Sequence, residues 1–357
     1  MDQTRLARVA ANMADQGLEQ IVVTATASVY YLTGIHVDPM ERMLALLIRD
    51  DGSCTLYANE LFAIPHQPDL PMKLHTDSND PASILAADLK PGKLGVDKWW
   101  PSKFLIGILS RRSDIVPVLG SGPVDDARMC KDEAEIAAMR RASQINDRVM
   151  DTVIRAIHAG ASERELAEVV ENAFRANGAD RSNEGQLVCF GPNGADPHHG
   201  PNETRIKVGD SVVMDIFIPI QRYWCDMTRT VFFGAVSEEG RRVYETVRAA
   251  NEAAEAMIRP GIPMRDIDAA ARKVITDAGY GPYFTHRLGH GCGLECHEPP
   301  DNSSACEVLT RPGMVFSVEP GIYLPGKLGV RIEDLVLVTE TGCEVLNAYP
   351  KDLLVVE

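Results

Sequence analysis

The sequence predicts a mixed α/β (α+β) protein with a small N-terminal α/β domain followed by a larger second domain. Three observations lead to this prediction. A chain of 357 residues is long enough to form two hydrophobic cores. Short apolar strands alternate with amphipathic helical segments along its length. The turn-rich stretch LGSGPVDDAR (119–128) separates two regions of different pattern, so we place the domains at residues 1–125 and 126–357.

The first region alternates helical and extended patterns. We expect a helix near Thr4–Gln16, a strand at Ile21–Thr24, and two strands at Met43–Ile48 and Cys54–Tyr57 joined by the turn RDDGS. The remaining elements continue the alternation: helix Ile84–Leu89, strand Leu94–Asp97, helix Lys103–Ser110 and strand Ile115–Val118. This order is typical of a small α/β sheet.

A long amphipathic helix opens the second region. Its apolar residues recur at helical spacing from Ile136 to Ile157, and Gly160 ends it. Ser162, with Glu165 three residues later, is a capping box that predicts a second helix. The later elements are helices at 238–258 and 264–278, and strands at 187–190, 211–218, 223–233, 314–319 and 330–338.

Charge and composition disfavour several classes of function. The formal net charge is −15, from 51 acidic and 36 basic residues. This disfavours nucleic acid and anionic membranes as partners, because phosphate binding needs clustered Lys and Arg. The longest apolar run, Met43–Ile48, is too short to span a bilayer. The opening residues do not resemble a secretory signal, and the eight cysteines show no CxxC spacing. We therefore expect a cytoplasmic protein with reduced thiols.

The stretch HRLGHGCGLECHE (286–298) contains three histidines and two cysteines. Two kinds of metal site would use it differently. A soft zinc site would combine Cys and His. A site for a harder ion would take one histidine and borrow carboxylates from other strands.

Two predicted hairpins supply those carboxylates. If residues 219–222 form the loop in SVVMDIFIPIQRYWCDMTRTVFF (211–233), Asp215 and Asp226 face each other, with Cβ atoms about 5 Å apart. If Tyr323 pairs with Gly329, Glu319 faces Glu333 in the same way. Four buried carboxylates need positive charge between them. Together with one histidine they suit two divalent cations, and the cysteines are then bystanders.

These residues resemble a known family. The segments PHHGPNETRIKVGD, GDSVVMDI, YWCDMTRTVFFG, RLGHGCGLECHEPP and GMVFSVEPGIYLPGKLGVRIED are similar to the pita-bread dinuclear metallopeptidases of the methionine aminopeptidase and prolidase superfamily, over roughly residues 130–357. The stretch YYLTGIHVDPMERMLALLI (30–48) resembles the creatinase/prolidase N-terminal domain, which methionine aminopeptidases lack. The resemblance is greatest to the Xaa-Pro dipeptidases, or prolidases.

The resemblance implies five metal ligands: Asp215, Asp226, His290, Glu319 and Glu333. These would hold two divalent ions, with Mn²⁺ expected first and Co²⁺, Zn²⁺ or Fe²⁺ as alternatives. Glu319 would also act as the general base toward the attacking water. His297 would contact the carbonyl oxygen of the scissile bond.

Further substrate contacts are implied by the same resemblance. His198, which lies 17 residues before Asp215, would bind the substrate or leaving group, with His199 as the alternative. The other expected substrate-binding residues are His286, Arg331, Tyr323 and Asp38. Arg331 could pair with the substrate carboxylate, pair with a ligand carboxylate, or form a purely structural salt bridge. Met40 stands where related dipeptidases often have a histidine.

The function implied is hydrolysis of the peptide bond before a C-terminal proline by a homodimer. A bond to proline lacks an N–H and has a fixed φ, so a dedicated enzyme suits it. The alternatives are an Xaa-Pro aminopeptidase acting on longer peptides, and a metal-dependent hydrolase or lyase with a non-peptide substrate.

Overall fold

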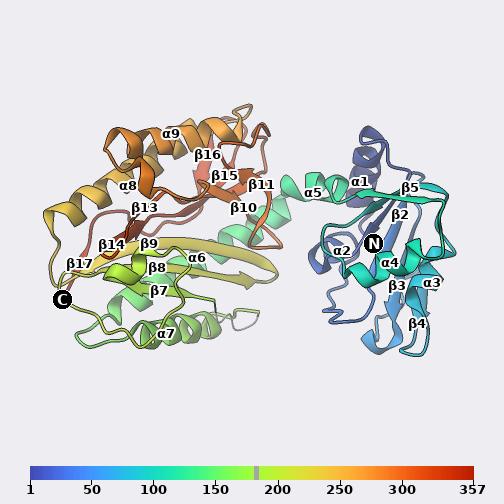
Figure 1. Cartoon of the computed structure of the whole chain (residues 1–357), viewed down its shortest axis with the longest axis horizontal. Helices are drawn as coiled ribbons and strands as arrows, with labels where there is room; N and C mark the ends of the chain where they lie inside the picture. The colour runs from blue at the N-terminus through green and yellow to red at the C-terminus, as the bar shows by residue number, and fades with distance from the viewer. Residues whose placement is uncertain (181–184) are drawn as a thin grey trace. The chain divides into compact units, whose positions relative to one another are not determined.

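The computed structural model describes residues 1–180 and 185–357, and it divides the chain into two compact units, Met1–Arg128 and Met129–Glu357 (Figure 1). Buried apolar side chains fill the inside of each unit.

The N-terminal unit is built on one six-stranded sheet with the order β4-β3-β2-β1-β5-β6. Strands β1, β2 and β3 form an antiparallel meander, and the other neighbours are parallel. The strands are β1 (Gln20–Val23), β2 (Ala45–Arg49), β3 (Cys54–Asn59), β4 (Met72–His75), β5 (Gly92–Val96) and β6 (Ile115–Leu119). The helices are α1 (Gln3–Asp15), α2 (Thr26–Thr33), α3 (Pro81–Ala86), α4 (Ser102–Leu109) and α5 (Gly122–Met129), with a 3₁₀ turn at Glu60–Phe62.

Two predictions for this unit need correction. The stretch 119–128 ends where the two units divide, as expected of a domain edge, but most of it forms helix α5 and not turns. Val124 and Ala127 of this helix are buried, and a proline in a first helical turn removes no helical hydrogen bond. The helix expected over 84–89 begins earlier, at Pro81, because the Asp80 side chain accepts a hydrogen bond from the N–H of Ala82 and caps it.

The C-terminal unit contains two mainly antiparallel sheets, with the orders β11-β10-β12-β15-β16 and β17-β9-β8-β7, and the hairpin β13-β14. The strands are β7 (Leu187–Phe190), β8 (Ser211–Ile220), β9 (Tyr223–Phe233), β10 (Gly289–Gly291), β11 (Glu298–Asn302), β12 (Val315–Val318), β13 (Gly321–Leu324), β14 (Leu328–Arg331), β15 (Asp334–Val338), β16 (Cys343–Val345) and β17 (Val355–Val356). The helices are α6 (Glu133–Arg155), α7 (Glu163–Ala176), α8 (Glu238–Met257) and α9 (Met264–Asp277), with 3₁₀ turns at Gly191–Ala195 and Gly281–Tyr283.

The four α-helices α6 to α9, among the described residues of this unit, cover the strands in two pairs. Helices α6 and α7 share a core with β7, β8 and β9. Helices α8 and α9 share a core with β12, β13, β14 and β15. Figure 1 shows α8 and α9 above the strands and α7 below them, with α6 crossing behind the strands. The strands that carry the predicted site therefore lie between two helical layers.

Capping boxes begin both α6 and α7. The predicted box of Ser162 and Glu165 is confirmed, and Asp132 and Glu135 form a second one ahead of α6. The long helix ends at Arg155, earlier than the predicted stop, and a turn leads from there to α7.

The hairpin of β8 and β9 has a different register from the predicted one. Its loop contains only residues 221–222, which both adopt positive φ (51° and 75°), as a two-residue hairpin turn requires. Asp215 therefore pairs with Thr228, and Asp226 pairs with Phe217. The predicted direct opposition of the two aspartates is wrong. Because the shift is two residues and strand side chains alternate, both carboxylates still lie on the same face.

The strand expected over 314–319 is confirmed as β12, and the run ends before Pro320, which has no N–H to donate. The strand expected over 330–338 is interrupted between β14 and β15. The predicted pairing of Tyr323 with Gly329 is confirmed, and β12 pairs with β15 in the same register. Glu319 and Glu333 therefore occupy opposed positions in the gap between two aligned ladders.

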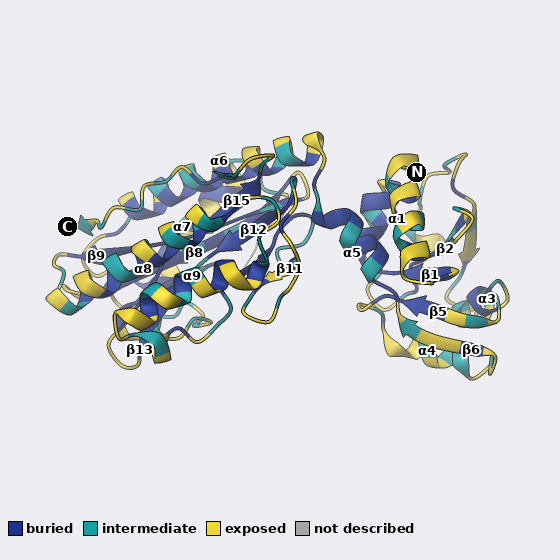
Figure 2. Cartoon of the chain, turned by 90° about the horizontal axis from the view of Figure 1, so that it is seen from above, coloured by how far each residue is buried: buried dark blue, intermediate teal, exposed yellow. Residues whose placement is uncertain are grey.

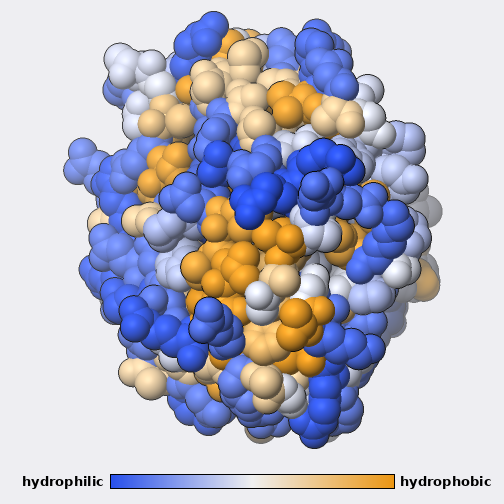
Figure 3. All heavy atoms as spheres, turned by 90° about the vertical axis from the view of Figure 1, so that its left-hand side faces the viewer, coloured by the Kyte–Doolittle hydropathy of each residue, from blue (hydrophilic) through white to orange (hydrophobic). Residues whose placement is uncertain are grey.

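Burial follows this layered arrangement. In Figure 2 the strands of the C-terminal unit are mainly buried, and the helices expose one face each. The face shown in Figure 3 is largely hydrophilic, with apolar groups gathered near its centre. No helix among the described residues is both long and apolar enough to cross a membrane.

Candidate metal centre and active site

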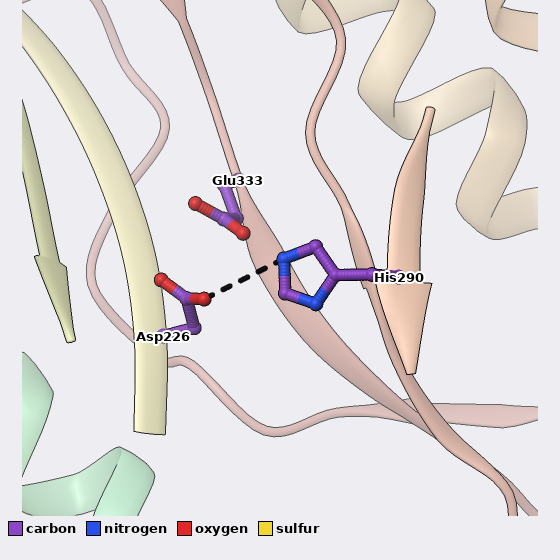
Figure 4. A group of neighbouring side chains, drawn as sticks. All are labelled: Asp226, His290 and Glu333. Atoms are coloured by element: carbon purple, nitrogen blue, oxygen red, sulfur yellow. Dashed lines mark ion pairs between the residues drawn. The ribbon is translucent and has the colours of Figure 1, made fainter. Parts of the chain in front are cut away.

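The C-terminal unit gathers the five predicted ligands from separate strands. Asp215 lies on β8, Asp226 on β9 and His290 on β10, while Glu319 and Glu333 lie in the gap between the aligned ladders. Ligand atoms of Asp226, His290 and Glu333 all lie within 4.8 Å of one another, and Figure 4 shows these three side chains pointing toward a common centre. The geometry is that of a preformed cation site.

His290 has one nitrogen that faces the carboxylates. Its Nε2 lies 3.7 Å from Oδ2 of Asp226 and 3.3 Å from Oε1 of Glu319. Its Nδ1 lies 3.2 Å from the carbonyl oxygen of Gly291. A carbonyl only accepts, so Nδ1 carries the proton and Nε2 presents its lone pair to the carboxylates. This backbone contact is the usual way in which a metal-binding imidazole is fixed.

Burial and crowding perturb these groups strongly. Burial, together with the neighbouring carboxylates, raises the pKa of Asp226 and of Glu333 well above the usual range. Burial and nearby Asp215 raise the pKa of Glu319 to about 7, although Arg331 opposes the change. Burial lowers the pKa of His290 to about 3. Bound cations would stabilise the charged carboxylates and the neutral imidazole, so this donor set fits divalent metal ions.

Three neighbouring side chains donate hydrogen bonds to the carboxylates. Oγ of Ser317 lies 3.0 Å from Oε1 of Glu319, and Oγ1 of Thr228 lies 2.7 Å from Oε2 of Glu333. Sγ of Cys296 lies 3.4 Å from Oδ2 of Asp226. These donors orient the carboxylates from outside the cluster.

Cys292, the other cysteine of the stretch 286–298, is not part of the described cluster. It is fully buried, and its thiol donates to the carbonyl oxygen of Trp224 at 3.6 Å. Burial raises the pKa of the thiols of Cys292 and Cys296 well above the usual range. The arrangement therefore agrees with a carboxylate and imidazole site rather than a thiolate site.

Arg331 brings positive charge to the cluster. Its Nη2 lies 2.6 Å from Oδ2 of Asp215, its Nε donates to Thr228 at 3.0 Å, and its Nη1 donates to the Tyr323 hydroxyl at 2.9 Å. The side chain is 4% exposed. Of the three predicted roles, the structure supports pairing with the carboxylate of a proposed ligand.

The same chain of hydrogen bonds reaches His286. Its Nδ1 lies 2.6 Å from the carbonyl oxygen of Arg287 and therefore carries the proton, so Nε2 accepts from the Tyr323 hydroxyl at 2.9 Å. Burial and the charge of Arg331 lower the pKa of His286 to about 4. Arg331, Tyr323 and His286 thus form one ordered series of donors and acceptors beside the cluster.

Glycines allow the strand of His290 to fit among its neighbours. A Cβ at Gly289 would collide with the carbonyl oxygen of Ser317, and a Cβ at Gly291 would collide with that of Glu298. The GHG sequence of β10 is therefore a packing requirement of the site.

The other histidines of the predicted site, His297, His198 and His199, differ in their surroundings. His297 lies over His290, with ring centroids 3.9 Å apart. His198 is exposed, and its charge lowers the pKa of both His286 and His297, though burial is the larger cause for each. His199 instead contacts the fully buried Glu163, 3.1 Å from its Nε2. His199 is thus engaged by Glu163, and the substrate contact of His198 stays a prediction.

Asp38 belongs to the N-terminal unit. Its carboxylate is exposed and accepts a hydrogen bond from the N–H of Met40 at 3.0 Å. This contact holds the loop that contains Met40, which has a positive φ of 47°.

The sequence did not predict two residues that contact the proposed ligands, Thr228 and Ser317. It also did not predict Glu163, the buried partner of His199, which accepts hydrogen bonds from Phe190, Asn193 and Asn202. A signal existed for Thr228, because it lies two residues after Asp226 and so shares its strand face. The position of Glu163 in a first helical turn gave no such signal.

Comparisons with known proteins agree with this site. Sequence profiles match "Metallopeptidase family M24" over residues 137–340 and "Creatinase/Prolidase N-terminal domain" over residues 5–130. The chain belongs to metallopeptidase family M24. It is 36% identical over 360 residues to an uncharacterized peptidase of Staphylococcus aureus (strain MSSA476), covering 98% of this chain and 100% of the relative.

Solved structures extend the comparison over both units. A prolidase from Thermococcus sibiricus is 35% identical, with a TM-score of 0.92 and 100% coverage of both chains. Dipeptidase PepE from Mycobacterium ulcerans is 34% identical, with a TM-score of 0.92 and 99% coverage of both chains. The fold is thus a creatinase-like N-terminal domain followed by a pita-bread domain, and the protein is a metal-dependent peptidase.

Proposed function

We propose that the protein is an Xaa-Pro dipeptidase, which hydrolyses the peptide bond before a C-terminal proline. The observation that carries the proposal is the buried cluster of Asp226, His290 and Glu333, flanked by Asp215 and Glu319. It occurs in a chain that resembles a prolidase along its full length.

The five residues would hold two divalent ions, with Mn²⁺ as the first candidate and Co²⁺, Zn²⁺ or Fe²⁺ as alternatives. When bound, such ions supply Lewis acidity and make water a nucleophile near neutral pH. A preformed carboxylate and imidazole set, rather than thiolates, favours ions that prefer oxygen ligands.

Glu319 is the proposed general base. Its Oε1 lies 3.3 Å from Nε2 of His290, so the carboxylate would stand beside the water that bound ions activate. Ser317 donates to one of its oxygens and so fixes the orientation of the carboxylate. The group can then take a proton from water and pass it to the leaving nitrogen.

His297 and His198 are proposed to contact the substrate. Both are exposed, in contrast to the buried ligands, so they can reach a peptide that enters the site. His297 would stabilise negative charge developing on the carbonyl oxygen, and His198 would bind the substrate or the leaving group. His286 and Tyr323, which are hydrogen-bonded to each other, would complete the substrate side of the site.

The free carboxylate of a dipeptide needs a positive partner. Arg331 already donates to three partners, Asp215 among them, so we propose that it orients Asp215 and does not bind the substrate carboxylate directly.

We further propose that the substrates are small Xaa-Pro peptides. We also propose that the enzyme is a homodimer and that it acts in the cytoplasm.

Three peptides test the proposal. Chelator-stripped protein, with and without Mn²⁺, is incubated with Ala-Pro, Ala-Pro-Ala and Ala-Ala, and the products are identified by mass spectrometry. We expect metal-dependent release of proline from Ala-Pro alone. Cleavage of Ala-Pro-Ala as well would replace the proposal with an Xaa-Pro aminopeptidase. Bound metal without cleavage of any peptide would indicate a non-peptide substrate.

A further inference from the structure

A group of charged side chains, two of them buried and two half-buried, lies beside the backbone of the two proposed glutamate ligands. It consists of two cations and two anions: Arg229, Lys351, Asp334 and Glu255. Nη2 of Arg229 lies 2.7 Å from Oδ1 of Asp334, and Nζ of Lys351 lies 2.7 Å from both Oδ2 of Asp334 and Oε1 of Glu255. The charges balance, as buried ionic groups require.

The first link of this group runs to Glu333. Nη1 of Arg229 donates to the carbonyl oxygen of Glu333 at 2.7 Å and to that of Thr228 at 3.0 Å. Its other nitrogens contact the carbonyl oxygen of Tyr349 and Oδ1 of Asp334. The guanidinium therefore fixes the peptide of Glu333 against strand β9, which carries Asp226.

The second link runs to Glu319. Nδ2 of Asn251, a fully buried residue of α8, donates to the carbonyl oxygen of Val318 at 2.9 Å. Val318 directly precedes Glu319. The other atom of the amide, Oδ1, accepts a hydrogen bond from Nζ of Lys351 at 2.6 Å.

Both links meet at one ammonium group. Nζ of Lys351 donates to Oδ1 of Asn251 and to the carboxylate of Glu255, and it forms an ion pair with Asp334. The backbone is also anchored, because the Tyr244 hydroxyl lies 3.2 Å from the carbonyl oxygen of Lys351. Lys351 is thus the common point between the strand of Glu319 and the strand of Glu333.

We propose that Lys351 is a positioning residue that fixes the distance between the carboxylates of Glu319 and Glu333. The inference rests on the proposed roles of these glutamates as metal ligands. Groups that support ligands from behind hold the geometry on which metal affinity depends. Lys351 contacts neither carboxylate, and it acts on them through Asn251 and through Asp334 with Arg229.

The test compares Lys351→Met with Lys273→Met. The control removes an equally charged side chain from an exposed ion pair with Asp277, 2.6 Å apart on α9. Co²⁺ binding to chelator-stripped protein is measured by calorimetry, and the visible absorption spectrum is recorded at saturating Co²⁺. We expect Lys351→Met to bind Co²⁺ about 10- to 100-fold more weakly with an altered spectrum, and Lys273→Met to match the wild type.

An unchanged affinity and spectrum in Lys351→Met would overturn the proposal. If this variant does not fold, Asn251→Ala replaces it, because that change breaks the link to Val318 without leaving a charge unpaired. The same weakening is expected, and wild-type binding would again overturn the proposal. Two further variants, Glu319→Gln and Glu333→Gln, test the metal-ligand roles independently of Lys351. If these glutamates are not metal ligands, both variants will bind Co²⁺ like the wild type.

Discussion

At the scale of single residues, the site combines buried carboxylates, whose negative charge is costly away from water, with groups that supply positive charge. Asp226, Glu319 and Glu333 are crowded and largely removed from water, and all three have raised pKa values. Asp215 has a buried positive partner in Arg331. The cluster is therefore held ready for cations at a cost to the stability of the metal-free protein.

Removing the charge of Arg331 tests this balance. Arg331→Met leaves Asp215 buried without its partner, and breaking a buried ion pair in this way costs about 3 kcal/mol or more. The free energy of unfolding is measured in urea on chelator-stripped protein. Arg140→Met is the control, because Arg140 and Glu344 form an exposed pair whose loss costs about 1 kcal/mol or less. Equal losses in the two variants would contradict the assigned role.

The raised pKa of Glu319 predicts a pH dependence of stability. Its folded value of about 7 lies above the ordinary value of 4.5, so the folded metal-free protein holds a proton that the unfolded chain releases. The stabilisation from this group is complete below pH 4.5 and is lost as the pH rises through about 7.

Thermal unfolding of stripped protein between pH 5.5 and 8 measures this dependence. The melting temperature of the wild type should fall more steeply with pH than that of Glu319→Gln, which cannot titrate. With Mn²⁺ the trend should reverse, because metal binding displaces protons and strengthens as the pH rises. Parallel curves for the two stripped proteins would contradict the prediction.

At the scale of elements, the site depends on the register of its strands. The sequence predicted the facing carboxylates because side-chain alternation survives an error of two residues, as in β8 and β9. It did not predict the two-residue turn, because Gln221 and Arg222 are not the Asn and Gly that usually adopt positive φ there. The break at Pro320 has a local cause, because proline cannot donate to a ladder, whereas the break between β14 and β15 has no such signal in the periodicity.

The positive φ of Arg222 in the turn between β8 and β9 leads to a further prediction. Arg222 has a φ of 75°, which glycine adopts without strain. Arg222→Gly should therefore keep the register and leave the free energy of unfolding unchanged or increase it by up to about 1 kcal/mol. Urea unfolding and the rate of Ala-Pro hydrolysis check this. A loss of more than about 1 kcal/mol would show that the arginine side chain stabilises the hairpin.

At the scale of the whole molecule, the two units differ in which proposed site residues they contain. All five proposed ligands and both helical layers belong to the C-terminal unit. The N-terminal unit contains the loop of Asp38 and Met40. The proposed ligands could be named from the sequence because each belongs to a motif, and the motifs follow one another along the chain as they do in the family. The links through Lys351, Arg229 and Asn251 had no local pattern, because they join segments about 70 to 120 residues apart.

The central claim is that the cluster holds the metal ions on which hydrolysis depends. The most direct test is the metal content of wild type and Asp226→Ala after equilibration with Mn²⁺, measured by native mass spectrometry together with the rate of Ala-Pro hydrolysis. We expect two ions per wild-type chain, and loss of bound metal and of activity in the variant, with an unchanged circular dichroism spectrum. A folded Asp226→Ala protein that keeps two ions and full activity would contradict the account.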